Sequence, residues 1–465
     1  MYDAHRWKAK SSSAASVSAA RPPPLVGYVV GASIFILPGE LAASTGPAIF
    51  LSFLLASIPA LLSCFVTAQI GCVYPVSGGP YIAASRNLSP FAGFMLVWSL
   101  MLGATIGIAL IAYGFADYLA FFIPGVPQMA VALGLVVLFA VINLLGARLS
   151  VLAQSFMVAG FLLALFVFGV FGLPHVQMAH LEPLFPNGYS PVIGAAIPAY
   201  FSYVGFSMIA DFAGDVKDPG NTIPKALLIA FLCIVFFYTL VPFTLVGTVA
   251  WAELAETTAP VATAAATFLP GIVASLISFG ALFAAATSVN GILLAISRDI
   301  YALARDQIFP AALGRLGGQK HMPRAAILTV ALLGLIGISW GASITQYALS
   351  AVMAIMLVQI LSAAAVFALP RKSPERFAAA GFRLSPFWRV FCCVGLILFS
   401  LGFIGLGVAQ GGASVGVFAS IIALGALYYA LRKRALSSKG LRIEDVLRKD
   451  QMLASTGEGS WKSLS

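Results

Sequence analysis

Stretches of about 20 apolar residues, the length that a helix needs to cross a bilayer, recur along almost the whole of this chain. Only 9% of its 465 residues are charged and 60% are hydrophobic, whereas soluble domains carry roughly a quarter charged residues. We count twelve such stretches, at residues 25–44, 48–71, 89–122, 129–147, 150–172, 191–213, 226–250, 270–297, 325–341, 344–369, 387–409 and 412–431. They leave no room for a sizeable soluble domain, so we expect an all-α membrane protein with twelve transmembrane helices.

The basic residues are distributed unevenly between alternate loops. If the N-terminus is cytoplasmic, all 26 Lys and Arg residues fall on the cytoplasmic side. The outer loops at 173–190 and 251–269 contain none. This positive-inside pattern predicts a multi-pass protein of the plasma (inner) membrane with both termini in the cytoplasm. The net charge of +10 is therefore interpreted as a topology signal, with the lipid bilayer and not nucleic acid as the partner.

Composition divides the chain into three parts. Residues 1–24 are rich in Ser and Ala, end in three prolines and lack the apolar core of a signal peptide, which predicts a disordered cytoplasmic tail. Residues 25–431 contain the twelve apolar stretches and form the expected twelve-helix membrane domain, and the basic, polar residues 432–465 form a second cytoplasmic tail. The five cysteines show no metal-ligand spacing and none lies in an outer loop, so neither zinc nor a disulfide framework is expected.

Two of the apolar stretches are interrupted near their centres. The first contains Gly31-Ala32-Ser33, and the sixth contains the run from Ser202 to Ser207. Lipid cannot satisfy main-chain groups that such a break exposes, at a cost of several kcal/mol each, unless they line a cavity or bind a ligand. Paired breaks of this kind are typical of a transporter site at the bilayer midplane.

Four motifs carry a resemblance to a known family. They are Gly31-Ala32-Ser33-Ile34-Phe35, Tyr74-Pro75-Val76-Ser77-Gly78-Gly79-Pro80-Tyr81, the run from Tyr203 through Asp215-Val216-Lys217-Asp218-Pro219 to Pro224, and the run from Ser297 to Asp306. In this order and spacing the chain resembles the amino acid–polyamine–organocation superfamily of secondary transporters. The resemblance implies the leucine-transporter fold. Residues 25–172 and 191–369 would form a 5+5 inverted repeat with broken helices 1 and 6, and residues 387–431 would form two peripheral helices.

A broken helix offers opposite partial charges to a ligand. The amides at the start of one half suit a carboxylate, and the carbonyls at the end of the other suit an ammonium group. The resemblance implies that the amides around Ala32, Ser33 and Ile34 meet the carboxylate of an amino acid. The candidate binding residues are Val29, Gly31, Ala32, Ser33, Ile34, Phe201, Ser202, Val204, Gly205 and Ser207, with the carbonyls of Val29, Phe201 and Val204 expected to meet the amino group. The alternative is close helix packing through Gly27-x-x-x-Gly31.

Three positions bear on substrate choice. Ser33 stands where the family usually has a second glycine, and Ser207 stands where many members have a glutamate linked to proton movement. Phe201 matches an aromatic position that covers the substrate in relatives, although a lone Phe is otherwise an ordinary core or lipid-facing residue.

The coupling ion is left open between sodium, a proton and ion-independent exchange. The resemblance implies a candidate sodium site at Gly27, Val30, Ala284, Thr287 and Ser288, whose oxygens suit a hard cation. Alternatively, the two hydroxyls bond back to their own helix. Phe161 stands where some proton-coupled relatives have a lysine, and Asp211 is a candidate proton carrier or inner-gate residue.

These observations favour a transporter that moves an amino acid or close amine derivative by alternating access, without a resident cofactor. A polyamine or organic-cation transporter is the alternative within the fold, and a membrane amino acid sensor is the alternative outside transport. An enzyme is not expected, because none of the four histidines lies in a span and no nucleophile–base pair is visible. The oligomeric state and the particular substrate are left open.

Overall fold

Helices account for all the regular secondary structure that the computed structural model describes. Residues 31–76, 78–145, 147–208, 213, 216, 218–254, 256–317, 323–438 and 440 are described, with the backbone alone at 147–153, 155, 207 and 208. The α-helices are α3 (Ser33–Thr45), α4 (Ile49–Val73), α5 (Gly79–Asn87), α6 (Pro90–Ala120), α7 (Gln128–Leu145), α8 (Ala147–Gly172), α9 (Ser190–Tyr200), α10 (Gly205–Met208), α11 (Pro219–Thr248), α12 (Trp251–Leu254), α13 (Pro260–Phe268), α14 (Gly271–Arg305), α15 (Arg324–Ser339), α16 (Ile344–Lys372), α17 (Pro374–Ala379), α18 (Pro386–Gln410) and α19 (Ala413–Ser437). Short 3₁₀ turns connect them, at Gly46–Ala48 (η1), Leu173–His175 (η2), Met178–Leu181 (η3), Phe201–Tyr203 (η4) and Ala311–Gly314 (η6).

The long helices confirm the predicted class of all-helical membrane protein. Within the described ranges, nine apolar helical stretches are long enough to cross a bilayer, one of which combines α3 and α4. Helix α15 is apolar but shorter, and α9 ends at the break in the sixth predicted stretch. Some boundaries differ from those expected: α11 begins at Pro219 rather than at residue 226, and α14 continues to Arg305 rather than ending at 297.

Capping residues mark the starts of several helices. The side chain of Ser89 accepts from the amide of Ala92 and begins α6. Ser343 and Gln346 form a reciprocal capping box at the start of α16. Gly78, with φ of 73°, supplies the left-handed conformation that precedes α5. At α6 and α16 these caps coincide to within one residue with the predicted starts at 89 and 344.

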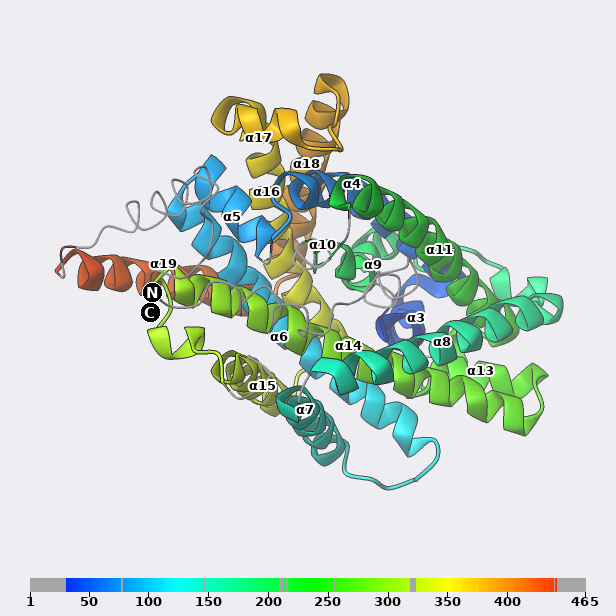
Figure 1. Cartoon of the computed structure of the whole chain (residues 1–465). Coiled ribbons are helices and arrows are strands. Elements are labelled where there is room, and N and C mark those ends of the chain that lie inside the picture. Colours follow the sequence, from blue (N-terminus) through cyan, green and yellow to red (C-terminus); the bar gives the residue numbers. More distant parts are fainter. Residues whose placement is uncertain are drawn as a thin grey trace.

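The helices that border the two predicted breaks lie inside the bundle. Helices α3 and α9 pack against each other, α4 packs on both of them, and α11 packs on α3 and α4 (Figure 1). Helix α6 crosses the core and packs on α14, α15 and α16. Helices α18 and α19 pack at the periphery, mainly on α16. This arrangement brings segments from both halves of the chain to one interior site.

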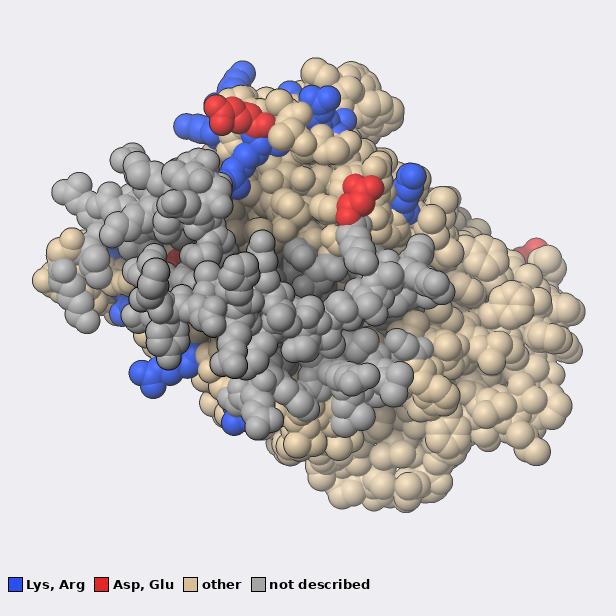
Figure 2. Space-filling model, viewed as in Figure 1, with Lys and Arg blue, Asp and Glu red and all other residues tan. Residues whose placement is uncertain are grey.

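The outer surface is largely apolar. On α18 and α19, for example, Phe387, Leu398 and Leu427 are each more than half exposed. Soluble proteins rarely expose contiguous apolar patches on this scale, so lipid must cover these faces. Lys and Arg side chains gather around α17, whereas the broad face over α8 and α13 shows none (Figure 2). Surface and helix length together identify a multi-pass membrane protein.

We predict that the hydroxyl of Tyr118 is a major local stabiliser. It donates to the carbonyl of Phe35 at 2.7 Å and accepts from the amide of Val261 at 3.3 Å, joining α6 to α3 and α13. Tyr118→Phe would remove both bonds and leave the buried amide of Val261, in the first turn of α13, without a partner, at about 1–3 kcal/mol. The melting temperature of the purified protein in detergent should fall.

Tyr189→Phe is the matched control, because that ring is 69% exposed. It should leave the melting temperature unchanged. Equal melting temperatures for Tyr118→Phe and the parent protein would contradict the prediction.

Candidate functional site

The first predicted break, at Gly31-Ala32-Ser33, falls at the start of α3, and the residues before Gly31 lie outside those described. Helix α3 starts at Ser33 after Ala32, which provides no side-chain cap. The amide of Gly31 donates to the Tyr238 hydroxyl on α11 at 3.2 Å, and the amide of Ala32 donates to the Ser288 hydroxyl on α14 at 3.3 Å. Two side chains from distant spans therefore satisfy main-chain groups that lipid could not.

The amides of Ser33 and Ile34 follow in the first turn of α3. No described residue accepts a hydrogen bond from either of them. They lie at the positive end of the helix dipole, as the first amides of any helix do. The start of α3 therefore presents two donors to the interior of the bundle.

The second break separates α9 from α10. Helix α9 contains Pro198 and ends at Tyr200, the 3₁₀ turn η4 follows, and α10 begins at Gly205. The carbonyl of Phe201 accepts from the amide of Val204 at 3.2 Å. The hydroxyl of Ser202 is buried and has no hydrogen-bond partner among the described residues.

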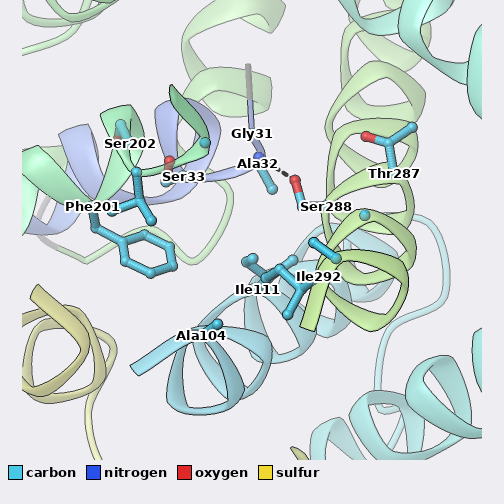
Figure 3. Close-up of a pocket in the computed structure, with 14 residues that line it drawn as sticks. Gly31, Ala32, Ser33, Ala104, Ile111, Phe201, Ser202, Thr287, Ser288 and Ile292 are labelled. Carbon is cyan, nitrogen blue, oxygen red and sulfur yellow. Dashed lines mark hydrogen bonds between the residues drawn. The ribbon is translucent and has the colours of Figure 1, made fainter. Parts of the chain in front are cut away.

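The two breaks line one pocket together with α6 and α14 (Figure 3). Its described lining residues are Gly31, Ala32, Ser33, Ala104, Ile111, Phe201, Ser202, Val204, Gly205, Thr287, Ser288, Gly291, Ile292 and Ala295. None of these side chains carries a charge. Recognition of a charged ligand would therefore depend on main-chain groups and hydroxyls.

Most of the predicted site residues come together here. Ile34 is fully buried in the first turn of α3 but does not line the pocket. Ser207 lies in α10, where only the backbone is described. Ala284 is buried in α14 and does not line the pocket. Gly27, Val29, Val30 and Asp211 lie outside the described residues.

Five lining residues were not identified from the sequence: Ala104, Ile111, Gly291, Ile292 and Ala295. A signal was present, because 104 and 111 are seven residues apart and 288, 291, 292 and 295 follow helical spacing on one face. Apolar residues at this spacing occur throughout a membrane bundle, so the pattern alone does not distinguish a pocket wall from lipid-facing surface.

The two candidate cation-binding hydroxyls on α14 bond back to their own helix, as in the alternative to a sodium site. The hydroxyls of Thr287 and Ser288 both donate to the carbonyl of Ala284, at 2.8 and 2.9 Å. Each oxygen keeps lone pairs, and that of Ser288 already accepts from Ala32. The three α14 oxygens are therefore adjacent, and all three take part in bonds within their own helix.

A chain of buried amides supports this part of α14. Asn143 of α7 donates to Asn290 at 2.8 Å, and Asn290 donates to Gln154 of α8 at 2.9 Å. Gln154 in turn donates to the carbonyl of Thr287 at 3.4 Å. Since unsatisfied amides are costly in an apolar interior, this network holds α7, α8 and α14 in register behind the pocket.

Two acidic residues, Glu40 and Asp117, lie outside the pocket. Glu40 of α3 accepts from both the amide and the hydroxyl of Thr345 at the start of α16, at 3.1 and 2.6 Å. Asp117 of α6 accepts from Gln128 at 2.5 Å. Both carboxylates thus join neighbouring elements, and neither lines the pocket.

Fold and site together define a multi-pass membrane protein with a small interior pocket between the start of α3 and the break that separates α9 from α10. The sequence model of the family described as "Amino acid permease" matches residues 12–428. The chain therefore belongs to the amino acid permease family. This confirms the resemblance to the amino acid–polyamine–organocation superfamily, and identifies the protein as an amino acid transporter and not an enzyme.

Sequence identity to individual relatives is low. The chain is 25% identical over 407 residues to the branched-chain amino acid permease BcaP of Bacillus subtilis (strain 168), covering 82% of this chain and 86% of the relative. It is 26% identical over 442 residues to the methylthioribose transporter of the same organism, covering 89% and 92%. It is also 29% identical over 314 residues to the chloroplastic cationic amino acid transporter 9 of Arabidopsis thaliana, covering 63% and 55%.

We predict that Tyr238→Phe weakens amino acid binding. Its hydroxyl holds the amide of Gly31 and so orients the first turn of α3. Loss of one such bond, about 1 kcal/mol, should raise the dissociation constant roughly fivefold. The dependence of the melting temperature on ligand concentration measures this constant.

Tyr203→Phe is the control, because its ring lies 5.1 Å from that of Tyr238 but its hydroxyl donates to Phe53 on α4. It should affect stability rather than affinity. An equal loss of affinity in both variants would contradict the assigned role of Tyr238.

Proposed function

We propose that this protein is a secondary transporter that carries an amino acid across the plasma membrane by alternating access. The observation that supports the proposal is one pocket, uncharged among its described lining residues, at which the start of α3 meets the break between α9 and α10. A zwitterion needs an anion site and a cation site close together, and helix ends supply both without charged side chains.

In this mechanism the substrate carboxylate binds at the start of α3. The amides of Ser33 and Ile34 are the donors, since the amide of Ala32 is already bonded to Ser288. The amino group binds main-chain carbonyls at the breaks, those of Val29, Phe201 and Val204. Ser202 and Ser207 are additional polar groups of the same site.

The proposed topology has twelve spans. The nine long apolar stretches, the separation of α3 from α4 by η1, the broken α9–α10 segment and α15 support that count. Residues 25–172 and 191–369 form the inverted repeats, and α18 and α19 are the peripheral helices. The loop charges support cytoplasmic termini.

Sodium is the coupling ion that we propose for testing first. Ala284, Thr287 and Ser288 provide three adjacent oxygens on α14, and the carbonyls of Gly27 and Val30 complete the proposed set. Such uncharged oxygen ligands suit a hard cation. Proton coupling through Asp211 and ion-independent exchange are the alternatives, and neither predicts stabilisation that depends on sodium.

A polyamine or organic-cation substrate is a weaker candidate. A cation in a low-dielectric pocket needs an acidic partner, because an unpaired buried charge is costly. No acidic side chain occurs among the described lining residues. A non-transporting sensor would bind ligand without moving it.

Uptake of labelled amino acids into proteoliposomes tests the proposal directly. Accumulation above protein-free vesicles is expected, and competition with unlabelled amino acids, spermidine and methylthioribose defines the substrate. Ligand-dependent stabilisation without uptake would indicate a sensor, and competition by spermidine alone would favour the polyamine alternative.

We predict that sodium increases ligand-induced thermal stabilisation relative to choline, and that Thr287→Ala abolishes this increase. The variant removes one proposed sodium ligand while leaving the main-chain substrate site intact. Ser278→Ala is the matched control, because its buried hydroxyl bonds back to Ala274 in the same helix, away from the pocket. Equal shifts in both buffers for the parent protein would argue against sodium.

A further inference from the structure

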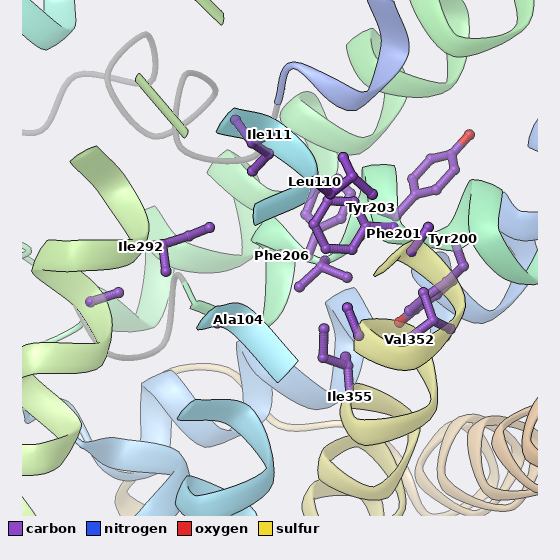
Figure 4. Packing of buried hydrophobic residues seen from close by; sticks show 14 of the residues in the cluster. Ala104, Leu110, Ile111, Tyr200, Phe201, Tyr203, Phe206, Ile292, Val352 and Ile355 are labelled. Atoms are coloured by element: carbon purple, nitrogen blue, oxygen red, sulfur yellow. The ribbon is translucent and has the colours of Figure 1, made fainter. Parts of the chain in front are cut away.

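Away from the start of α3, the walls of the pocket are aliphatic and aromatic. Ala104 and Ile111 on α6 face Ile292 and Ala295 on α14, with the ring of Phe201 beside them (Figures 3 and 4). Each of these side chains is at least nine-tenths buried. This part of the pocket offers dispersion contacts and no partner for a charge.

The position of the Phe201 ring depends on a glycine that does not itself line the pocket. Gly107 lies on α6 between Ala104 and Ile111, on the same face of the helix. A Cβ added there would lie 2.6 Å from Cζ and 2.7 Å from Cε2 of Phe201. Carbon atoms pack at about 3.5–4.0 Å, so the ring occupies space that only a glycine leaves open.

A side chain at residue 107 would make the pocket smaller. A methyl group at residue 107 would displace the ring tip by roughly 1 Å to restore ordinary contact. The open space next to the ring is the pocket that Phe201 lines. Displacement in that direction would shorten the aliphatic compartment.

We propose that this compartment accepts the side chain of a neutral aliphatic amino acid, and that Gly107 determines specificity by setting how far Phe201 projects into it. The inference rests on the proposed amino acid transport, and adds to it a substrate class and a residue that limits side-chain length. The carboxylate and amino group remain at the helix breaks, while the aliphatic walls select the side chain.

The test compares Gly107→Ala with the parent protein in proteoliposomes, using labelled alanine and leucine. The ratio of kcat/KM for leucine to that for alanine should fall about tenfold, because one methylene in an apolar pocket changes selectivity by this order. Phe201→Leu in the Gly107→Ala background should restore the ratio by returning the lost space.

Gly103→Ala is the matched control. It adds the same methyl group one turn earlier on α6, where the neighbours are Ala354 and Ala351 of α16 instead of Phe201. It should lower uptake of both substrates by the same factor. An equal change of ratio in this variant would overturn the inference, since selectivity would then follow any displacement of α6.

Other outcomes separate this inference from the proposed function. If the parent protein transports no amino acid, the proposed function fails. If it transports lysine or glutamate better than leucine, or if Gly107→Ala leaves the ratio unchanged, the inference alone fails. If Gly107→Ala does not fold, Phe201→Leu in the parent background tests the same compartment. This variant should raise uptake of phenylalanine relative to alanine. No increase would overturn the inference.

Discussion

The structure depends on satisfying main-chain groups where a helix is interrupted in an apolar interior. At the first break, the amide of Gly31 is bonded to Tyr238 and that of Ala32 to Ser288. Without such partners each exposed group would cost several kcal/mol, and a continuous helix would be favoured. The hydroxyls of two other spans thus make the break stable.

Those same bonds link architecture to binding. The amides of Gly31 and Ala32 are occupied, so the donors at the start of α3 that have no acceptor among the described residues are those of Ser33 and Ile34. In the proposed mechanism this segment is therefore a structural joint on one side and a ligand site on the other. The buried amide network of Asn143, Gln154 and Asn290 fixes the opposite wall.

The proposed recognition separates the head of the substrate from its side chain. Main-chain groups at the pocket do not depend on side-chain identity, so in this mechanism they serve any ligand with the same dipolar head. Side chains on α6 and α14 are free to vary around them. Gly107 illustrates this division, because a residue outside the pocket adjusts the pocket through Phe201.

The breaks were accessible to prediction because they are local. Small residues such as Gly31 and the run from Ser202 interrupt otherwise apolar stretches, and a one-dimensional pattern reveals that directly. The helix boundaries were less accessible, since α11 begins in the polar segment at Pro219 and α14 continues past the apolar run to Arg305. Hydropathy measures burial in lipid rather than hydrogen bonding along the backbone.

What the sequence alone determined is the class: an apolar, multi-pass helical protein whose paired interruptions indicate a ligand site in the membrane. Tertiary structure decided which groups meet at that site. Gly31 and Tyr238 are 207 residues apart, and Ala32 and Ser288 are 256 apart. In the sequence, the helix faces that carry Ala104 and Ile292 do not differ from other apolar faces. Only the packing of the helices places them at the pocket. Periodicity determines which face of a helix is apolar, and only the packed fold determines what that face meets.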